Sequence, residues 1–482
     1  LVVAARDEGR VHTLAGNVLD EAGADRFALK VVNLYEFCAY VHARKDATGK
    51  ARLLLSAAVA MLREYRPPHR ANIRLGVAGP NGRLSRRALL TIPMLRYELI
   101  PGVDETLCVA PRGCNLCSEV CPAGAITVDA GGAYIQKQAC RDCGLCLTAC
   151  PVGAISHPFY RRRVVDAGLK ALLARDDGPF APKIVAFACP GAIEALREAG
   201  RQRLSYSPTI LAWRVPCAGF VDWYLVLRAF DLGAAAVALQ SCGEGCRHRC
   251  TPEAAMGRFQ AIARLSDALG LGGARLHAFA EGSAPELVSK MNSFGKAVAC
   301  LPTPPLAQGP PTAVDVHRYQ VAPLLTALCQ RLGISDDLSL EDEEVPFGVA
   351  TIDGTKCSLC GLCAVRCPTR ALSYVVTGEG ARLLFKAREC TGCRLCVPAC
   401  PETALRIPRR LDLAALRADG QTLKTAAMVH CRRCGQPYAS EATVTHVLLR
   451  LGTRSLGAIV NYCPDCRMVA DPAPPERDKA PT

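Results

Sequence analysis

The cysteines of this chain carry its chemistry, and eight of them form two runs in the second half of the sequence. Each run has the spacing C-x2-C-x2-C-x3-C and is followed directly by a proline, Pro368 or Pro401. Three thiolates on one short loop can hold three corners of a cubane, and in the bacterial two-cluster pattern the last cysteine of each run completes the cluster of the other. The spacing therefore predicts two [4Fe–4S] clusters and not a disulfide framework or a zinc site. The expected ligand sets are Cys357, Cys360, Cys363 and Cys400 for one cluster, and Cys390, Cys393, Cys396 and Cys367 for the other.

A second pair of runs lies upstream, and one of its members is altered. Five residues separate Cys108 from Cys114, and Pro111 stands where a cysteine would complete the usual spacing. We expect Cys108 to loop back and serve as the missing ligand of a full cubane. The alternatives are that this cluster is lost or is a three-iron form. The expected ligand sets are Cys108, Cys114, Cys117 and Cys150 for one cluster, and Cys140, Cys143, Cys146 and Cys121 for the other.

Between these two modules the sequence alternates between strand-like and helix-like segments. KIVAFAC, TILAWRVPC and AAAVALQSC are strand patterns that end in Cys189, Cys217 and Cys242. The carboxyl ends of parallel strands meet at one edge of a sheet, where open α/β sheets bind ligands. We therefore expect these three thiols to converge, with Cys246 one loop further on and Cys250 after it.

This middle segment resembles the delta subunit of methyl-viologen-reducing hydrogenase, a [2Fe–2S] protein, in IVAFAC, RVPCAGFVDWYLVLRAF and GAAAVALQSCGEGCRHR. The segment departs from the family at Ala188 and Ala192, where the family often has cysteines, and in a C-x3-C pair that is one residue short. The resemblance implies one [2Fe–2S] cluster, with Cys250 as a possible replacement for one ligand. A cluster-free docking domain with buried thiols is the alternative. The implied ligands are Cys189, Cys217, Cys242 and Cys246.

Two C-x2-C pairs lie near the end of the chain, with 28 residues between them. Two such knuckles without a third cysteine suit tetrahedral zinc, and a metal at this site would supply folding free energy to a small module. A rubredoxin-like iron has the same ligand count. The expected zinc ligands are Cys431, Cys434, Cys463 and Cys466. Cys300 and Cys329 are expected to be buried structural thiols.

The first residues resemble part of the N-terminal domain of the A-type subunit of heterodisulfide reductase, from ARDEGRVHTLAGNVLDEAGADRF to LLLSAAVAML. That family carries an iron–sulfur cluster in this domain, followed by a flavin domain. Cys38 matches a family cysteine, whereas Arg6 stands at the position of another. Cys38 is therefore either the last ligand of a cluster whose other ligands precede Leu1 or an inert buried thiol. The segment GVAGPNG at 76–82 lacks the spacing of a dinucleotide fingerprint, so we expect no flavin in this chain.

Composition limits the other interpretations. The 482 residues suffice for several domains, and 28 cysteines clustered in short runs indicate metal sites in a reducing compartment. The formal charge of +14 is spread along the chain without a basic stripe interleaved with aromatic residues, so we expect acidic protein partners and no nucleic acid. The longest apolar run is shorter than 18 residues, which favours a cytoplasmic location or a peripheral position on a membrane complex. The chain begins abruptly at Leu1, and we expect residues upstream of it.

The sequence thus predicts a multidomain α/β and α+β protein. Its parts are two bacterial-type two-cluster ferredoxin modules, a flavodoxin/Rossmann-like α/β middle domain and a C-terminal zinc-ribbon-like module. The expected segments are a partial N-terminal α/β domain at 1–66, a connector at 67–107, a ferredoxin module at 108–160, the [2Fe–2S] domain at 181–300, a linker at 301–345, a second ferredoxin module at 346–410, the zinc-ribbon-like module at 425–469 and a disordered tail at 470–482.

Four [4Fe–4S] clusters, one [2Fe–2S] cluster and one zinc predict an electron-transfer subunit of an oxidoreductase complex. The two resemblances imply a redox enzyme on one side, such as a hydrogenase or formate dehydrogenase, and a heterodisulfide-reductase-type or flavin-containing partner on the other. The alternative is a complete oxidoreductase in which the altered Cys108 run leaves an iron site open to substrate. A non-redox scaffold is a third hypothesis, which four cubanes disfavour. The sequence offers no constellation of catalytic side chains.

Overall fold

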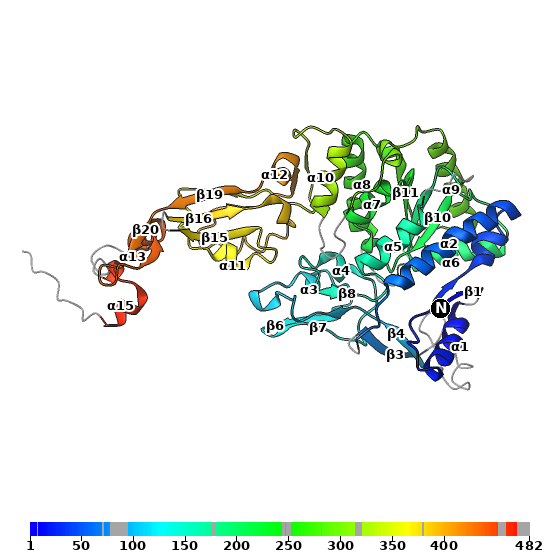
Figure 1. Ribbon diagram of the computed structural model, residues 1–482, viewed down its shortest axis with the longest axis horizontal. Coiled ribbons are helices and arrows are strands. Elements are labelled where there is room, and N and C mark those ends of the chain that lie inside the picture. Colours follow the sequence, from blue (N-terminus) through cyan, green and yellow to red (C-terminus); the bar gives the residue numbers. More distant parts are fainter. Residues whose placement is uncertain are drawn as a thin grey trace, which may run out of the picture. The chain divides into compact units, whose positions relative to one another are not determined.

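The structure is a computed structural model, and its chain divides into two compact units (Figure 1). Unit 1 comprises Leu1–Pro346 and Arg409–Leu416, and unit 2 comprises Phe347–Pro408 and Arg417–Thr482. The residues that the structure describes are 1–6, 8–69, 72–77, 95–174, 180–242, 246, 252–280, 282–313, 321–377, 380–451 and 459–469. The expected tail at 470–482, Cys250 and most of segment 76–82 lie outside them. Within the described residues no helix is both long and apolar enough to cross a membrane.

The core of unit 1 is a parallel four-stranded sheet in the order β10-β9-β11-β12. Its central strand β9 is fully buried along IVAFA, which explains the unbroken apolar run, because a strand covered on both faces has no polar side. Helix α6 packs with α9, and helix α7 packs with α8 and α10. The strands are β9 (Ile184–Ala188), β10 (Ile210–Arg214), β11 (Ala236–Ser241) and β12 (Leu276–Ala280), and the helices are α6 (Pro190–Arg201), η5 (Ala218–Phe220), α7 (Trp223–Asp231), α8 (Pro252–Ala268), η7 (Gly273–Arg275), α9 (Ala284–Ala299), η8 (Pro305–Gln308) and α10 (Val321–Arg331).

The N-terminal segment packs on this sheet domain. Its two short strands are parallel, its helix α2 packs along α5, and a single π-helical turn, η1, packs on α6. The expected helix at Gly16–Ala22 begins earlier, at Glu8, and the helix expected from Ala47 begins at Arg44. The elements are β1 (Val2–Ala4), α1 (Glu8–Glu21), β2 (Lys30–Val32), η1 (Tyr35–Ala39), α2 (Arg44–Glu64) and α5 (Arg162–Leu172).

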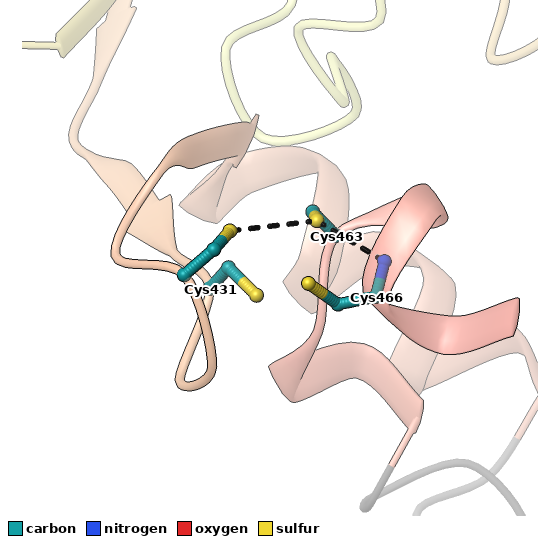
Figure 2. A group of neighbouring side chains, drawn as sticks. Cys431, Cys463 and Cys466 are labelled. Atoms are coloured by element: carbon teal, nitrogen blue, oxygen red, sulfur yellow. Dashed lines mark hydrogen bonds between the residues drawn. The ribbon is translucent and has the colours of Figure 1, made fainter. Parts of the chain in front are cut away.

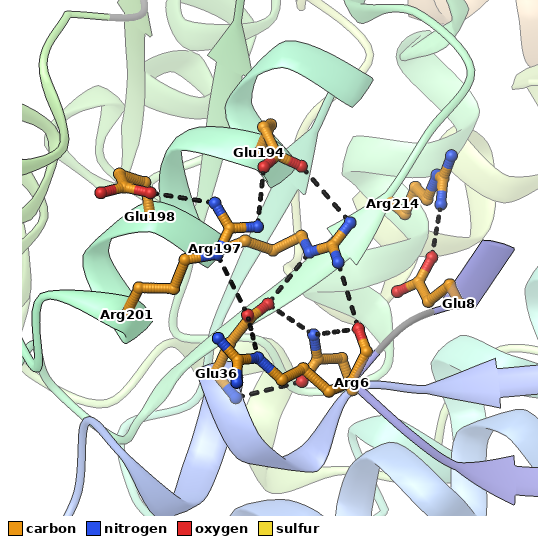
Figure 3. Close-up of polar contacts among 9 residues, drawn as sticks. Arg6, Glu8, Glu36, Glu194, Arg197, Glu198, Arg201 and Arg214 are labelled. Carbon is orange, nitrogen blue, oxygen red and sulfur yellow. Dashed lines mark hydrogen bonds and ion pairs between the residues drawn. The ribbon is translucent and has the colours of Figure 1, made fainter. Parts of the chain in front are cut away.

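A buried carboxylate links η1 to α6, as Figure 3 shows. Glu36 has no exposed surface and accepts hydrogen bonds from Arg197 Nε at 3.0 Å, Arg201 Nε at 3.3 Å, Arg6 Nε at 3.3 Å and Asn33 Nδ2 at 2.7 Å. Burial alone would raise the pKa of Glu36, but Arg197, Asn33 and Arg201 outweigh it and hold the pKa below its usual value. Removing one partner of such a buried pair typically costs about 3–5 kcal/mol, so Glu36 fixes the N-terminal segment on the sheet domain.

The first ferredoxin module of unit 1 is a small antiparallel structure around its cysteine loops. A hairpin, β6–β7, joins the two cysteine runs, and β5 pairs with β8 across the module. The elements are β3 (Ile73–Val77), β4 (Leu95–Leu99), β5 (Gly102–Val103), η4 (Ala110–Arg112), α3 (Leu116–Glu119), β6 (Ile126–Asp129), β7 (Gly132–Ile135), α4 (Leu145–Ala149) and β8 (Ile155–Ser156).

The segment expected as a linker is partly fixed by buried charges. Asp231 has no exposed surface, accepts hydrogen bonds from Thr312 N at 3.1 Å and Thr312 Oγ1 at 2.9 Å, and pairs with Arg228 and Arg331. This network ties residue 312 and α10 to α7. Further on, β13 (Ser339–Glu341) pairs antiparallel with β18 (Arg410–Asp412) within unit 1.

Unit 2 holds the second ferredoxin module and the C-terminal cysteine pairs. Its main sheet is antiparallel in the order β15-β16-β19, and two further strand pairs, β14–β17 and β20–β21, flank the cysteine loops. The elements are β14 (Thr351–Ile352), α11 (Leu362–Arg366), β15 (Leu372–Thr377), β16 (Gly380–Phe385), η9 (Ala387–Glu389), β17 (Leu405–Arg406), β19 (Gln421–Ala426), β20 (Met428–His430), β21 (Pro437–Ser440), α13 (Glu441–Leu451), η10 (Ile459–Asn461) and α15 (Pro464–Val469); α12 (Leu413–Arg417) crosses the unit boundary.

Candidate iron–sulfur and metal centres

All four cysteine runs end in the same backbone turn. The proline after the last cysteine lacks an N–H, and the residue two positions further on is left-handed, with φ between 49° and 67°. This turn directs a backbone N–H back to the sulfur of the last cysteine, at 3.2–3.5 Å. The left-handed residues are Gly124, Gly153, Arg370 and Thr403, and the sulfurs that accept are those of Cys121, Cys150, Cys367 and Cys400. Such N–H···S bonds stabilise thiolate charge and tune cluster potentials.

A second left-handed position precedes the second cysteine of three runs. It is occupied by Asp142, Leu359 and Gly392, with φ of 51°, 54° and 63°. Asp142 N donates to Cys140 Sγ, and Leu359 N donates to Cys357 Sγ, both at 3.4 Å. Leucine rarely adopts this conformation, which costs of order 1–3 kcal/mol, so the fold holds the loop in a strained form that points N–H groups at sulfur.

The altered run keeps its first ligand in place. Asp104 N bonds Ala154 O at 2.8 Å and Cys108 N bonds Asp104 O at 3.1 Å. In the second module Asp353 N bonds Ala404 O at 2.8 Å and Cys357 N bonds Asp353 O at 3.0 Å.

Cys108 therefore occupies the position of Cys357, and the run differs by three inserted residues and not by a missing cysteine. The insertion forms the turn η4 with left-handed Gly113 at φ 85°, directly before Cys114. Sequence spacing alone suggested a substitution at Pro111; the repeated Asp-x-Thr motif at 104–106 and 353–355 was the available signal for an insertion.

Two of the expected ligand sets line cavities. Cys108, Cys114, Cys117 and Cys150 line one, and Cys367, Cys390, Cys393 and Cys396 line another. The other two sets are also neighbours: the pKa of Cys146 is raised well above its usual value by burial and then by Cys143, Cys140 and Cys121. Likewise, the pKa of Cys363 is raised to about 11 by burial and then by Cys360, Cys357 and Cys400.

Crowding four thiols in this way is unfavourable without a cation. The pKa of Cys117 is raised to about 11, first by burial and then by Cys150, Cys114 and Cys108. A bound metal reverses this, because thiols that coordinate iron are deprotonated outright. The donor chemistry therefore fits [4Fe–4S] clusters, although the assignment of each thiol to a cluster stays a prediction.

In the middle domain the cysteines follow adjacent strand ends. Cys189, Cys217 and Cys242 come after β9, β10 and β11, which are neighbours in the sheet. The side chains of Cys189 and Cys246 interact with Cys242 and, together with burial, raise its pKa. Cys217 is buried at the end of the adjacent strand β10 and lies in a separate loop.

That Cys217 loop packs against the first ferredoxin module. The helix α4 contacts η5, and a Cβ added at Gly219 would lie 2.5 Å from Leu145 Cδ2 and 3.9 Å from Cys217 Sγ. On the other side of the contact, a Cβ added at Gly144 would lie 3.0 Å from the ring of Phe220. The two glycines allow a cysteine loop of the ferredoxin module, Cys143–Gly144–Leu145, to approach the loop that carries Cys217.

The C-terminal cysteines form a compact group, which Figure 2 shows. The four sulfurs of Cys431, Cys434, Cys463 and Cys466 lie within 4.8 Å of one another. The Cys434–Cys463 sulfur distance is 3.8 Å, and a tetrahedron with zinc–sulfur bonds of about 2.3 Å has edges of about 3.8 Å. Among the described residues, no other group of three or more Cys, His, Asp or Glu brings its ligand atoms this close.

The protonation of this group also suits a cation. Burial raises the pKa of Cys431, but backbone N–H groups of Cys463, Cys434 and Arg433 outweigh it and bring the pKa to about 6. The neighbouring thiol of Cys463, followed by burial, raises the pKa of Cys466 to about 12. The geometry accommodates one thiolate readily and further thiolates only with a metal.

The C-terminal group is attached to the second ferredoxin module through α13. Thr443 Oγ1 donates to Ser358 O at 2.9 Å, and Ser358 lies between two expected cluster ligands. Glu402, two residues after Cys400, accepts from Arg450 at 2.6 Å and pairs with His446 at 2.8 Å. One helix therefore contacts both loops that supply the Cys357 ligand set.

The cysteines outside these sets divide between core and surface. Cys329 is fully buried, as expected. The expectation for Cys300 was wrong: it is exposed, because it caps the end of α9 where the helix leaves the core. Cys38 is buried, and burial raises its pKa to about 11, with Lys50 opposing.

Two cations beside the cluster loops were not found from the sequence. Arg74 donates to the carbonyls of Cys140 and Lys137, and Lys424 donates to those of Cys357 and Gly354. Both come from strands remote in sequence from the runs they contact, so no local pattern marks them. Each adds positive charge close to a predicted cluster.

Taken together, two dicluster ferredoxin modules with cysteine sets of this chemistry define an iron–sulfur electron-transfer protein. Residues 110–155 and 350–407 each match the family described as 4Fe-4S dicluster domain. Residues 184–301 match the family described as methyl-viologen-reducing hydrogenase, delta subunit.

Curated relatives agree with the last match. The chain is 34% identical over 129 residues to the vhu iron-sulfur D-type subunit of the F420-non-reducing hydrogenase of Methanocaldococcus jannaschii, which covers 26% of this chain and 96% of that protein. It is 37% identical over 105 residues to the protein of the same name from Methanococcus maripaludis, covering 20% and 75% respectively. Through its middle domain the chain belongs to this delta-subunit family. The three matched family segments lie outside residues 1–66, so the resemblance to heterodisulfide reductase stays a prediction.

Proposed function

We propose that this chain is a multi-cluster relay in a hetero-oligomeric complex. It passes single electrons between a redox enzyme, such as a hydrogenase or formate dehydrogenase, and a heterodisulfide-reductase-type or flavin-containing partner. Bound [4Fe–4S] and [2Fe–2S] clusters supply the one-electron chemistry. The polypeptide contributes placement, N–H···S bonds and exclusion of water.

The observation that carries this proposal is the contact between two cysteine loops in unit 1. Gly144 and Leu145 follow Cys143, an expected [4Fe–4S] ligand, and they pack against Gly219 and Phe220, which follow Cys217. The contact joins a ferredoxin module to a delta-subunit-like domain within one folded unit. A relay needs such a junction, whereas a non-redox scaffold does not.

The middle domain would hold one [2Fe–2S] cluster through Cys189, Cys217, Cys242 and Cys246. Its support is the contact of Cys242 with Cys189 and Cys246, and the position of Cys217 on the neighbouring strand. The strand order β10-β9-β11-β12 corresponds to 2-1-3-4 in chain order, which is how flavodoxin-like sheets begin. We infer a flavodoxin/Rossmann-like domain on that basis.

The C-terminal module would hold structural zinc through Cys431, Cys434, Cys463 and Cys466, as a zinc-ribbon-like domain. The tetrahedral spacing of its sulfurs supports a single metal ion. For the altered run, the cavity shared by Cys108, Cys114, Cys117 and Cys150 supports four protein ligands and hence a closed cubane. That disfavours an open iron site and, with it, a substrate role.

Metal analysis with EPR tests this proposal. Anaerobically purified protein should contain about eighteen irons and about one zinc per chain. Reduction with dithionite should then produce both cubane and [2Fe–2S] signals. About sixteen irons without a [2Fe–2S] signal would make the middle domain a docking module, and clusters that dithionite leaves oxidised would contradict the relay.

A further inference from the structure

One cluster loop of unit 2 is exposed where its counterpart in unit 1 is covered. Among the twenty predicted cluster ligands, all within the described residues, Cys360 alone is exposed. Directly after it, Leu362 is 46% exposed and Val365 is 61% exposed. These three residues define the α11 face. Large apolar side chains beside an exposed cluster ligand are an unusual use of surface and indicate an interaction site.

The covered counterpart shows what this motif contacts elsewhere in the same chain. Gly144–Leu145–Cys146 at the start of α4 and Gly361–Leu362–Cys363 at the start of α11 share a left-handed glycine, with φ of 77° and 76°. On α4 this glycine and leucine are packed under Pro216, Gly219 and Phe220. The covering element is thus a loop that follows a cysteine of a redox domain.

The charges around the α11 face indicate the sign of its occupant. Lys356, whose side chain is 61% exposed, precedes the first ligand of the run, and Arg366 and exposed Arg370 follow α11. The acid in the same segment, Asp353, lies 3.5 Å from Lys356. Three cations against one acid make the rim basic, and a basic rim favours a partner with an acidic rim.

We propose that the α11 face is the docking site for a separate redox protein with an apolar centre and an acidic rim, which exchanges electrons through the Cys357, Cys360, Cys363 and Cys400 site. This inference rests on the proposed relay function and identifies where an external partner joins it. The partner would place a cofactor-bearing loop on Leu362 and Val365, as the Cys217 loop lies on Leu145.

Binding of a small acidic ferredoxin with two [4Fe–4S] clusters is the test. The holoprotein is immobilised anaerobically at low salt, and the Kd is measured for wild type and for a double variant, Leu362→Gln with Val365→Thr. The matched control is Leu449→Gln, an apolar-to-amide change on α13 at a side chain that is 79% exposed. We expect the double variant to weaken binding about tenfold or more and the control to leave it unchanged, because the apolar centre of an interface carries most of its affinity.

A charge series tests the rim independently. Lys356→Gln and Arg370→Gln should each weaken binding and flatten its dependence on salt, whereas Lys290→Gln, an exposed lysine in unit 1, should not. These variants remove one charge each and are expected to fold, since their side chains are at the surface.

Several outcomes would overturn the inference. Equal Kd values for the double variant and wild type, or equal losses in the double variant and the Leu449 control, would do so. A holoprotein that self-associates through Val365, as shown by sedimentation of wild type and variant, would make a second copy the occupant instead. Dithionite reduction followed by EPR separates this result from failure of the relay, because it loads the clusters without any docking.

Discussion

The two ferredoxin modules share their cysteine turns but differ in what surrounds them. In the first module, α4 is covered by the Cys217 loop of the middle domain. In the second, α11 presents exposed Leu362 and Val365. The same local motif is thus used once for an internal contact and once at the surface. The difference teaches that ligand spacing fixes what a loop binds, whereas its neighbours decide where an electron can leave.

The modules also differ within their first runs, and Cys108 is the residue that tests this difference most strongly. If the three inserted residues leave Cys108 in the role of Cys357, then Cys108→Ala should remove one cluster or convert it to a three-iron form. Iron content should fall by about one to four atoms per chain. Cys300→Ala, at an exposed cysteine outside the sets, is the control. Unchanged iron in Cys108→Ala would show that the altered run does not use this thiol.

A second contrast is a buried histidine in one module and an isoleucine in the other. His157 and Ile407 follow β8 and β17 at corresponding positions and are 3% and 4% exposed. Burial, and then the charges of Lys30 and Arg161, lower the pKa of His157 to about 3, although a backbone hydrogen bond with Leu99 opposes them.

Acid should therefore damage the first module before the second. Between about pH 6.5 and pH 3 the unfolded chain binds a proton at His157 that the folded chain does not, so stability falls as the pH falls through this window. The loss should reach the order of a few kcal/mol near pH 4. His157→Ile should retain first-module EPR signals to lower pH than wild type. Loss of those signals at the same pH in both proteins would refute the role of His157.

The covered junction can be disturbed with Gly219→Leu. The new side chain would meet Leu145, since a Cβ at this position already lies 2.5 Å from its Cδ2. Such overpacking should cost about 1–3 kcal/mol and lower the thermal midpoint of unit 1. Gly354→Ala in the second module, where a Cβ would meet no atom within 4 Å, is the control. We also expect slower electron exchange between the middle domain and the first module, measured by rapid-freeze EPR; an unchanged rate would remove the junction from the relay.

The smallest expected effect concerns the two cations, which make the modules alike. Arg74→Met and Lys424→Met each remove a positive charge beside the backbone of a predicted ligand, Cys140 or Cys357. Reduction adds negative charge, so the potential of the neighbouring cluster should become more negative by on the order of tens of millivolts. Redox titration followed by EPR measures this shift. Arg163→Met, which removes a cation paired with Glu64, should leave the potentials in place.

Much of this arrangement could be predicted because cysteine spacing and strand periodicity are local properties. The parallel strands of the middle domain lie where their apolar runs predicted them, since fully buried strands have an unbroken apolar pattern. The C-terminal cysteine pairs likewise come together as two knuckles suggest.

What the sequence did not reveal depends on contacts between distant residues. Nothing near Lys424 in the sequence indicates that its amine reaches the carbonyl of Cys357. The left-handed conformation of Leu359 is imposed by the loop and not by leucine itself. The exposure of Cys300 depends on where α9 ends relative to the core. Each is settled by tertiary packing, which overrides local preference.

The exchange of last cysteines between runs has a consequence for how the protein is made. Cys150 belongs with Cys108, Cys114 and Cys117 around one cavity, although more than thirty residues separate it from Cys117. Under the proposed ligand sets, no cluster of this module can be closed while the ribosome is still short of Cys150. Iron insertion must then wait for the whole module to emerge, which makes cluster assembly a late step of synthesis and exposes half-finished chains to oxidation.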